Sequence, residues 1–434
     1  MTTLLRGRLV SFDRRPEGPR DLDALTHEED GGLLIDAGRI RAAGPWAEIA
    51  PQAPGAAVHD HRGRLILPGL IDTHLHMPQM QVIASWGTEL LDWLNTYTFP
   101  AEQRFGDPAH ATRIAGLFLD ELIRHGTTTA VAYCTVHRAS AEALFEAALA
   151  RDMRLIAGKV LMDRNAPAAL TDTAQQGHDD SAALIGAFHG RGRLGYAITP
   201  RFAITSTPAQ LEAAGALAAA HPDCHVQSHL SENAAEIALT ADLYPEARDY
   251  FDVYARAGLA GPRSLFGHCL HLSGRERDAM AETGSVAVFC PTSNLFLGSG
   301  LFDMGGIEAA GIRTAVATDI GGGTSYSMLR TLDEGYKVLA LQGQRMDPLT
   351  AFWRATRGNA EALGLVERIG TLAPGSEADV TVLDPAATPA MALRLETVER
   401  LDEMLFLLQT LGCDRAVGAV YVAGRLAHGA PVGA

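Results

Sequence analysis

The sequence predicts an α/β fold, a TIM-like (β/α)8 barrel joined to a small β-rich domain that both ends of the chain form together. Strand-like and helix-like segments alternate between Pro68 and Ile369 in about eight units, which is typical of a parallel barrel. Similar strand–turn–strand patterns occur near both termini. The chain has 434 residues, 47% of them hydrophobic, so it can bury a large core. We place the barrel at residues 68–369 and the composite domain at residues 1–67 and 370–434.

The barrel strands are predicted from short apolar runs bounded by turns. These runs lie at residues 64–76, 129–134, 154–162, 196–202, 224–230, 264–272, 286–291 and 313–320. Helical spacing of apolar residues predicts helices at 107–126, 140–152 and 207–221; the first has Asp107 as N-cap, Pro108 at its first position and Gly126 at its end. A doubly wound sheet is the alternative, but no GxGxxG motif follows the first strand.

Each end of the chain contains a hairpin pattern. Gly31–Gly44 and Gly418–Gly429 both consist of two short strand-like runs around a glycine-containing turn. Ala378–Pro385 is a further short strand-like run. We therefore expect the two termini to contribute strands to one small sheet.

Charge and cysteine content restrict the class of protein. The net charge of −15 argues against nucleic acid or an anionic membrane surface as a partner. The five cysteines are scattered and form no CxxC pair, which favours a reduced, cytoplasmic protein. The sequence contains neither a signal-peptide pattern at its start nor an apolar run long enough to span a membrane. We expect a small molecule as the substrate.

Five residues of types that bind metals end predicted barrel strands. His74 and His76 close the first strand and, being two residues apart, project to the same face. His229, His268 and Asp319 end later strands, and the carboxyl ends of barrel strands carry the active site. Any one of them alone would be more simply explained as a hydrogen-bonded loop residue. Together they predict a metal site, because imidazole and carboxylate groups are metal ligands.

Glu232 follows His229 by three residues. A water activated at a metal site needs a base to take its proton and an acid to pass that proton on, and one carboxylate can do both. The alternative is a helix capping box that starts at Ser231. The nearby histidine favours the catalytic interpretation.

The order of these residues resembles the amidohydrolase superfamily, and longer segments resemble its guanine deaminase family. The segments are THLHMPQ, LLDWLNTYTFPAE, MDRNAP, YAITPRFAITS, HLSEN, CPTSNLFLGSGLF and TDIGGGTSYSMLRTLDE, which extend over nearly the whole chain. The resemblance implies one Zn²⁺ per subunit, held by His74, His76, His229 and Asp319.

The resemblance also implies the chemistry. His268 would orient or polarise the attacking water, Glu232 would be the proton shuttle, and Asp319 would help to pass a proton to the departing amine. The reaction would be the hydrolysis of guanine to xanthine and ammonia, in purine catabolism or salvage, by a homodimer.

Two side chains near the predicted metal site match the edges of guanine. The Gln79 carboxamide is both donor and acceptor, and the Arg201 guanidinium can donate two parallel N–H groups to the O6 and N7 acceptors of guanine. Phe202 could pack against the ring, and we expect His229 and Trp86 to contact the substrate as well. Trp86 stands where the resemblance leads us to expect a tyrosine. Without the resemblance, a surface salt bridge for Arg201 and a core aromatic for Phe202 would be favoured.

Three alternatives remain. The substrate could be another amino-substituted ring, such as a pterin or a triazine. The barrel could be a non-catalytic scaffold, which would purify without stoichiometric zinc. Lys159 lies in a predicted strand and could be a carboxylated metal bridge, but we favour a structural role.

Overall fold

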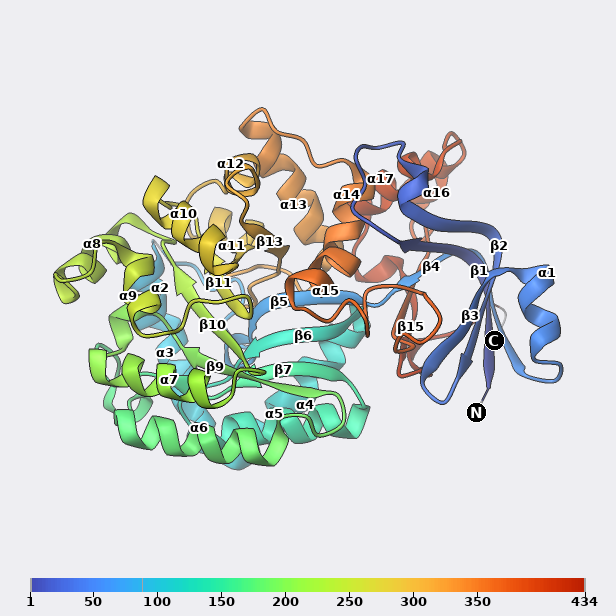
Figure 1. Ribbon diagram of the computed structural model, residues 1–434. Coiled ribbons are helices and arrows are strands. Elements are labelled where there is room, and N and C mark those ends of the chain that lie inside the picture. Colours follow the sequence, from blue (N-terminus) through green and yellow to red (C-terminus); the bar gives the residue numbers. More distant parts are fainter. Residues whose placement is uncertain (1, 88, 433–434) are drawn as a thin grey trace.

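The computed structural model describes residues 2–87 and 89–432. Two sheets organise the chain, a parallel barrel and a separate seven-stranded sheet beside it (Figure 1). The neighbouring barrel strands run in the order β13-β12-β11-β10-β9-β7-β6-β5, with β8 paired to β9. This arrangement confirms the predicted (β/α)8 barrel and the additional β-rich unit.

All paired barrel strands are parallel. The barrel strands are β5 (Leu70–His76), β6 (Thr127–Tyr133), β7 (Arg154–Gly158), β8 (Val160–Leu161), β9 (Leu194–Pro200), β10 (His225–Leu230), β11 (Ser264–His268), β12 (Val286–Phe289) and β13 (Arg313–Val316). Helices surround them: α4 (Pro108–Arg124), α5 (Arg138–Arg151), α6 (Ala174–Phe188), α7 (Pro208–Ala220), α10 (Gly274–Thr283), α12 (Met304–Ala309), α13 (Met328–Leu341), α14 (Pro348–Trp353) and α15 (Asn359–Ala362). Further helices lie in the segments that follow the carboxyl ends of β5, β10 and β12: α2 (Leu90–Trp93), α3 (Phe99–Gln103), α8 (Ala234–Leu243), α9 (Tyr250–Arg256) and α11 (Pro291–Phe296).

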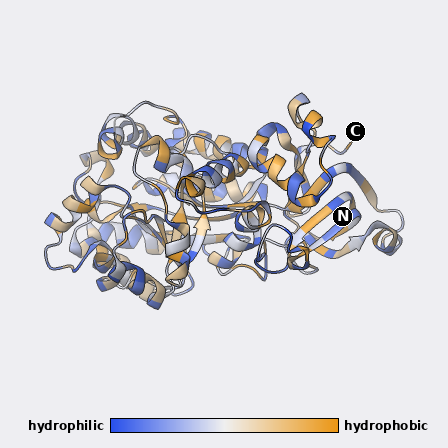
Figure 2. Ribbon diagram, turned by 90° about the horizontal axis from the view of Figure 1, so that it is seen from above, coloured by the Kyte–Doolittle hydropathy of each residue, from blue (hydrophilic) through white to orange (hydrophobic). Residues whose placement is uncertain are grey.

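Helix α4 begins and ends where the sequence predicts. The Asp107 side chain accepts a hydrogen bond from the backbone N–H of Ala109 at 2.9 Å, and Pro108 occupies the first turn. Gly126 has φ of +86°, a conformation that favours glycine after a helix. The helix buries Ile114, Phe118 and other apolar residues on one face. Figure 2 shows that other helices are amphipathic as well, because apolar and polar residues alternate along their length.

Strands from both termini share the second sheet, in the order β16-β15-β14-β4-β1-β2-β3. Its strands are β1 (Thr3–Phe12), β2 (Leu25–Asp36), β3 (Arg39–Pro45), β4 (Ala57–Pro68), β14 (Val380–Leu383), β15 (Val417–Val422) and β16 (Arg425–Gly429). Both predicted hairpins, β2–β3 and β15–β16, are antiparallel pairs of this sheet. The small helix α1 (Trp46–Ile49) packs on it.

The predicted strand at residues 64–76 is two strands that belong to different sheets. Strand β4 ends at Pro68 in the terminal sheet, and β5 begins at Leu70 in the barrel. Gly69 connects them where a Cβ atom would lie 2.0 Å from Thr128 Oγ1, so the chain can pass only without a side chain. The predicted strand at 154–162 is likewise interrupted, at Lys159.

The domain division stays a prediction, because the C-terminal segment contacts both units. It provides β14, β15 and β16 to the terminal sheet. It also provides α16 (Pro389–Leu395) and α17 (Leu401–Leu411), and α17 packs against the barrel helices α13 and α14.

A side chain joins the first and last barrel strands. Among the described residues, no backbone ladder connects β5 to β13. Asn359 bridges them: its Nδ2 donates to the carbonyls of Ile71 and Val316, both at 2.8 Å, and its Oδ1 accepts from Val316 N at 2.9 Å. Further along, Asp319 N donates to the His74 carbonyl at 2.9 Å. The Asn359 amide, the Thr73 hydroxyl, which donates to the Val316 carbonyl at 3.2 Å, and this backbone hydrogen bond together close the barrel next to the residues that are predicted to bind metal.

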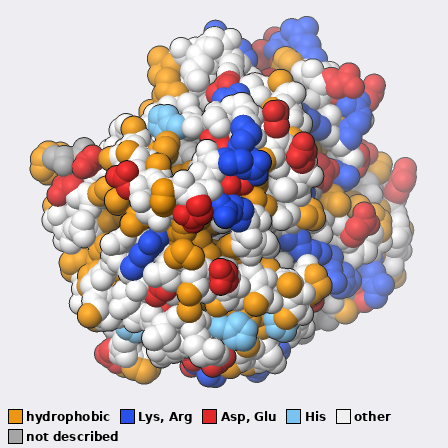
Figure 3. Space-filling model, turned by 60° about the vertical axis from the view of Figure 1, so that its left-hand side comes forward, with side chains coloured by type: hydrophobic (Ala, Val, Ile, Leu, Met, Phe, Trp, Pro, Cys, Tyr) orange, Lys and Arg blue, Asp and Glu red, His pale blue; other side chains and the backbone are white. Residues whose placement is uncertain are grey.

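The surface is mixed in character. Figure 3 shows one face, on which hydrophobic side chains lie among acidic and basic ones. Of the helices in the described part of the chain, none has the length and apolar character needed to cross a bilayer.

Candidate active site

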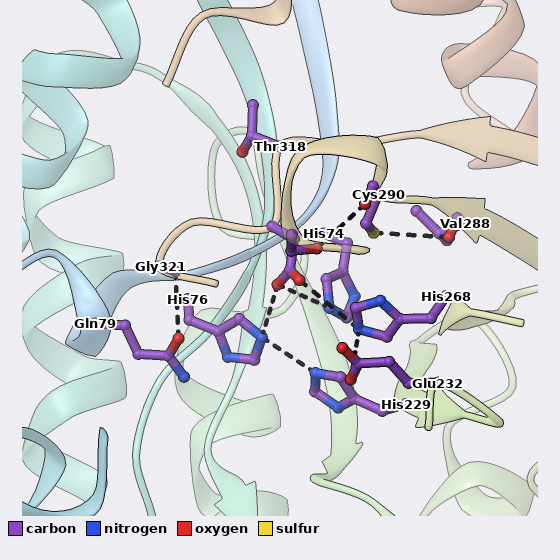
Figure 4. Close-up of polar contacts among 12 residues, drawn as sticks. His74, His76, Gln79, His229, Glu232, His268, Val288, Cys290, Thr318 and Gly321 are labelled. Carbon is purple, nitrogen blue, oxygen red and sulfur yellow. Dashed lines mark hydrogen bonds and ion pairs between the residues drawn. The ribbon is translucent and has the colours of Figure 1, made fainter. Parts of the chain in front are cut away.

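The five predicted metal-binding residues meet at the carboxyl ends of the barrel strands, and Figure 4 shows how the four histidines lie. His74 and His76 end β5, His229 lies in β10, His268 ends β11, and Asp319 follows β13. His74 is fully buried, and His76, His268 and Asp319 are nearly so. The fold thus brings together side chains that are far apart in the sequence, such as His74 and Asp319, which are separated by 245 positions.

The ring nitrogens and the carboxylate converge on one point. His76 Nε2 lies 3.2 Å from His229 Nε2 and 3.3 Å from Asp319 Oδ1, which is also 3.5 Å from His74 Nε2. Ligand atoms of His74, His229, His268 and Asp319 all lie within 4.8 Å of one another. Both ring nitrogens of His74, and Nδ1 of His76, are buried without a hydrogen-bond partner. These donors fit a single Zn²⁺ ion, which prefers imidazole and carboxylate ligands.

Outer hydrogen bonds orient two of the imidazoles. His229 Nδ1 lies 2.7 Å from the Arg201 carbonyl, and His268 Nδ1 lies 2.8 Å from Asn294 Oδ1. Because a carbonyl oxygen only accepts, each Nδ1 must carry the proton. The Nε2 atoms are thereby directed to the centre, as in metal sites whose ligands are held by an outer shell.

The charge states also suit a metal. Burial lowers the pKa of His76 to about 3 and that of His229 well below its usual value, so both rings are neutral. Burial raises the pKa of Asp319, but the adjacent rings of His74 and His76, whose Nε2 atoms lie 3.5 and 3.3 Å from its Oδ1, outweigh burial and hold that pKa well below the usual range. The site therefore presents neutral imidazoles at His76 and His229 and an ionised carboxylate at Asp319.

The backbone is strained at two of these residues. Asp319 has a φ of +53° and His268 has a φ of +71°, in the left-handed region that residues other than glycine rarely adopt. Asp72 holds the segment before Asp319 in place, because its carboxylate accepts hydrogen bonds from both the backbone N–H and the hydroxyl of Thr318. Strain of this kind is concentrated at functional sites.

Glu232 faces the centre from beside His268. It is 2% exposed; its Oε1 accepts from Ser299 Oγ at 3.0 Å, and its Oε2 lies 3.4 Å from His268 Nε2. Burial, with a further contribution from the charge of Asp319, raises the pKa of Glu232 to about 8. A carboxyl group with this pKa can hold a proton at neutral pH and also release it.

The alternative capping role for this segment falls to other residues. Helix α8 has Asn233 as its N-cap, and Asn233 forms the capping box with Glu236. Ser231 is not at the cap, because its φ of +52° turns the chain before the helix begins. The Glu232 backbone N–H donates to Glu236 Oε2 of α8 at 2.9 Å, whereas its side chain takes no part in the cap and lines the pocket.

Most of the predicted substrate contacts line one pocket next to this centre. The lining residues are His76, Gln79, Leu90, Trp93, Leu94, Arg201, Phe202, His229, Glu232, His268, Leu297, Asp319 and Gly322. Trp86 is not among them: it is 75% exposed, so the expectation that it contacts the substrate is not supported. Trp93, which is 2% exposed, lines the pocket instead. The sequence signal for it was present, because Trp93 lies in the LLDWLNTYTFPAE segment.

Sequence reasoning missed Glu102, which lies behind the two polar pocket residues. It is completely buried on α3 and accepts from Arg201 Nη1 at 2.9 and 2.8 Å. It also accepts from Gln79 Nε2 at 3.2 Å, while Gln79 Oε1 accepts from Gly321 N at 3.2 Å. Arg201 is therefore in a buried ion pair and not in a surface salt bridge. Lys159 lies outside the cluster and pairs with Asp172.

Comparison with known proteins shows the family of the chain. Residues 65–427 match the model of the amidohydrolase family, and the chain belongs to that family. Within it, the chain is similar to guanine deaminases: it is 46% identical to that of Escherichia coli strain K12 over 98% of this chain and 97% of the other.

Two solved structures of guanine deaminases superpose on the fold. That of E. coli has a TM-score of 0.96, 46% identity and coverage of 98% of this chain and 99% of the other. That of C. acetobutylicum with bound guanine in its active site has a TM-score of 0.89, 28% identity and coverage of 98% and 100%.

Proposed function

We propose that the protein catalyses the hydrolytic deamination of guanine to xanthine and ammonia. The observation that carries this proposal is Glu232, a buried carboxyl group whose pKa is raised to about 8, placed 3.4 Å from His268 beside a converging set of imidazoles. The similarity to guanine deaminases along nearly the whole chain supports the choice of substrate. In this proposal the protein is a hydrolase of a C–N bond in a cyclic amidine.

His74, His76, His229 and Asp319 would hold one Zn²⁺ per chain. A zinc ion bound there would supply Lewis-acid chemistry and would lower the pKa of water to roughly 7. We assign His268 to the attacking water, because its Nε2 faces both Glu232 and Asp319 Oδ2, the latter at 3.7 Å.

Two carboxyl groups then move the two protons of the water. Glu232 takes the first and delivers it to the ring nitrogen beside C2, while the water oxygen bonds to C2. Asp319 takes the second and passes it to the amine, so that the C2–N bond breaks and ammonia leaves. Glu232 and Asp319 end in their starting protonation states, and the ring carries a new carbonyl at C2. His268 orients the water by accepting a hydrogen bond from it at Nε2, because its Nδ1 carries the proton and donates to Asn294 Oδ1.

Arg201 and Gln79 would bind the polar edges of guanine, and Phe202 and Trp93 would pack against the ring. The side chains of Leu90, Leu94 and Leu297 add apolar surface to this part of the pocket. These contacts favour a planar, mixed donor–acceptor ring.

We also propose that the protein works in the cytoplasm as a homodimer. Unpaired cysteines, four of the five buried, suit a reducing compartment. The dimer rests on the family resemblance, and light scattering of the purified protein tests it: a monomer mass would contradict it.

The test of the function is the conversion of guanine to xanthine, followed by absorbance. We expect zinc-loaded wild type to convert guanine and a Glu232→Gln variant to lose about 10²- to 10⁴-fold in kcat while keeping its zinc. Glu212→Gln, at an exposed position on α7, is the matched control and should retain full activity. If zinc-loaded wild type leaves guanine untouched, the substrate assignment is wrong, and amino-substituted pterins and triazines come next.

A further inference from the structure

We infer that Glu102 is a positioning residue that sets which donors and acceptors Arg201 and Gln79 present to the ring, and so selects a 6-oxo purine. The inference rests on the proposed function and adds a specificity determinant to it. Glu102 does not line the pocket. It acts through the two residues that do.

The geometry of the ion pair with Glu102 leaves the Nε and Nη2 groups of the Arg201 guanidinium available to a ligand. A guanidinium usually pairs with a carboxylate through two nitrogens in parallel. Here both carboxylate oxygens of Glu102 take hydrogen bonds from Nη1, at 2.9 and 2.8 Å. Within residues 2–87 and 89–432, the Arg201 Nε and Nη2 groups have no acceptor, and the side chain lines the pocket. The paired charge is thus held in the core while its other N–H groups can bind a ligand.

Glu102 also decides which way the Gln79 amide points. A carboxylate only accepts hydrogen bonds, so the Gln79 group at 3.2 Å from it must be the NH₂. A backbone N–H only donates, so the group that Gly321 N contacts at 3.2 Å must be Oε1. The two contacts leave one N–H and one lone pair of the amide for a ligand, in a fixed order. Because Gln79 is 2% exposed, it cannot turn without breaking both.

This arrangement predicts selectivity at the 6-position of a purine. The free N–H groups of Arg201 match the adjacent O6 and N7 acceptors of guanine. A ring without O6, such as 2-aminopurine, would leave a buried donor unpaired, and such sites reject the incomplete ligand strongly. Replacing Glu102 by glutamine removes the charge that holds Nη1 and gives Gln79 a partner that can either donate or accept. Both constraints on the pocket then weaken together.

The experiment compares guanine with 2-aminopurine in zinc-loaded wild type and Glu102→Gln. We expect the variant to keep its zinc and to lose at least about 10-fold in the ratio of kcat/KM for guanine to that for 2-aminopurine, chiefly through a higher KM for guanine. Glu377→Gln is the matched control. Glu377 is also buried and accepts from two arginines, Arg154 and Arg193, each at 2.9 Å, but it lies outside the pocket. The Glu377→Gln variant should have lower thermal stability than wild type but the same ratio of kcat/KM for guanine to kcat/KM for 2-aminopurine.

A zinc-loaded, folded Glu102→Gln variant whose ratio stays within about twofold of wild type would overturn the inference. If that variant does not fold, Glu102→Asp keeps the charge but is too short to reach both Arg201 and Gln79, and the same criterion applies to it. The failure of the proposed function is a separate result, seen as no turnover of guanine by wild type. In that case calorimetric binding of guanine and 2-aminopurine to wild type decides the inference, and equal affinities would overturn it.

Discussion

Replacing Asn359 by alanine should open the junction between the first and last barrel strands. Asn359 is fully buried, and its amide makes three hydrogen bonds to the backbone of β5 and β13. Alanine keeps the backbone of α15 but removes the partner of the Ile71 carbonyl and of the Val316 N–H, while the Val316 carbonyl still accepts from Thr73 Oγ1 at 3.2 Å. Ile71 and Val316 each stand three residues before a predicted metal ligand, His74 and Asp319. The change should therefore affect both stability and metal binding.

The expected magnitude follows from the bonds removed. A buried hydrogen bond contributes about 1 kcal/mol net, so three give about 3 kcal/mol. Backbone groups left unsatisfied add to this, while the better helix propensity of alanine returns about 0.6 kcal/mol. We expect a loss of about 3–5 kcal/mol in the free energy of unfolding, a large part of the roughly 5–15 kcal/mol typical of a domain.

Urea denaturation of the metal-free chain measures the stability, and metal analysis after dialysis measures zinc retention. Asn95→Ala is the matched control, because Asn95 is exposed and its amide donates to the Leu91 carbonyl within the same helical segment, at 2.8 Å. It should change stability by less than about 0.5 kcal/mol. If Asn359→Ala stays within about 1 kcal/mol of wild type, Asn359 does not hold the barrel closed. If it is destabilised but retains zinc normally, the bridge does not position the ligands.

Three further outcomes are expected. Gly267→Ala should abolish zinc retention, because the new Cβ atom would lie 2.6 Å from the His74 ring. Gly274→Ala is the control, since nothing lies within 4 Å of a Cβ atom there, and it should retain zinc. Equal zinc retention by the two variants would refute the steric argument. Burial lowers the pKa of His225, whose Nε2 is 3.0 Å from the Leu363 carbonyl, to about 4. Stability is therefore full above pH 6.5 and falls by up to about 3 kcal/mol towards pH 4, since the unfolded chain takes the proton first. Urea midpoints of wild type at pH 7 and pH 5 should differ more than those of His225→Gln, and an equal difference would exclude His225 as a cause. Removal of metal with a chelator should lower Tm, and added zinc should raise it in a concentration-dependent way; a Tm insensitive to zinc would argue against a metal site in the folded state.

The sequence by itself determined the elements and the residue types at their ends. The apolar runs, the Asp107 cap and the glycine-containing hairpin turns are local signals, and they predict local structure because each depends on neighbours within a few residues. A parallel barrel also places all carboxyl strand ends on one side. For that reason His74, His76, His229, His268 and Asp319 could be grouped before any geometry was known.

Tertiary structure decided how these residues are held and which others join them. Glu102 meets Arg201 across 99 positions, and Asn359 meets Ile71 across 288, contacts that no local pattern encodes. The division of residues 64–76 between two sheets, and the burial of Trp93 in place of Trp86, depend on close packing against distant segments. Hydrogen bonds and burial act through space, so the sequence specifies them only by way of the complete fold.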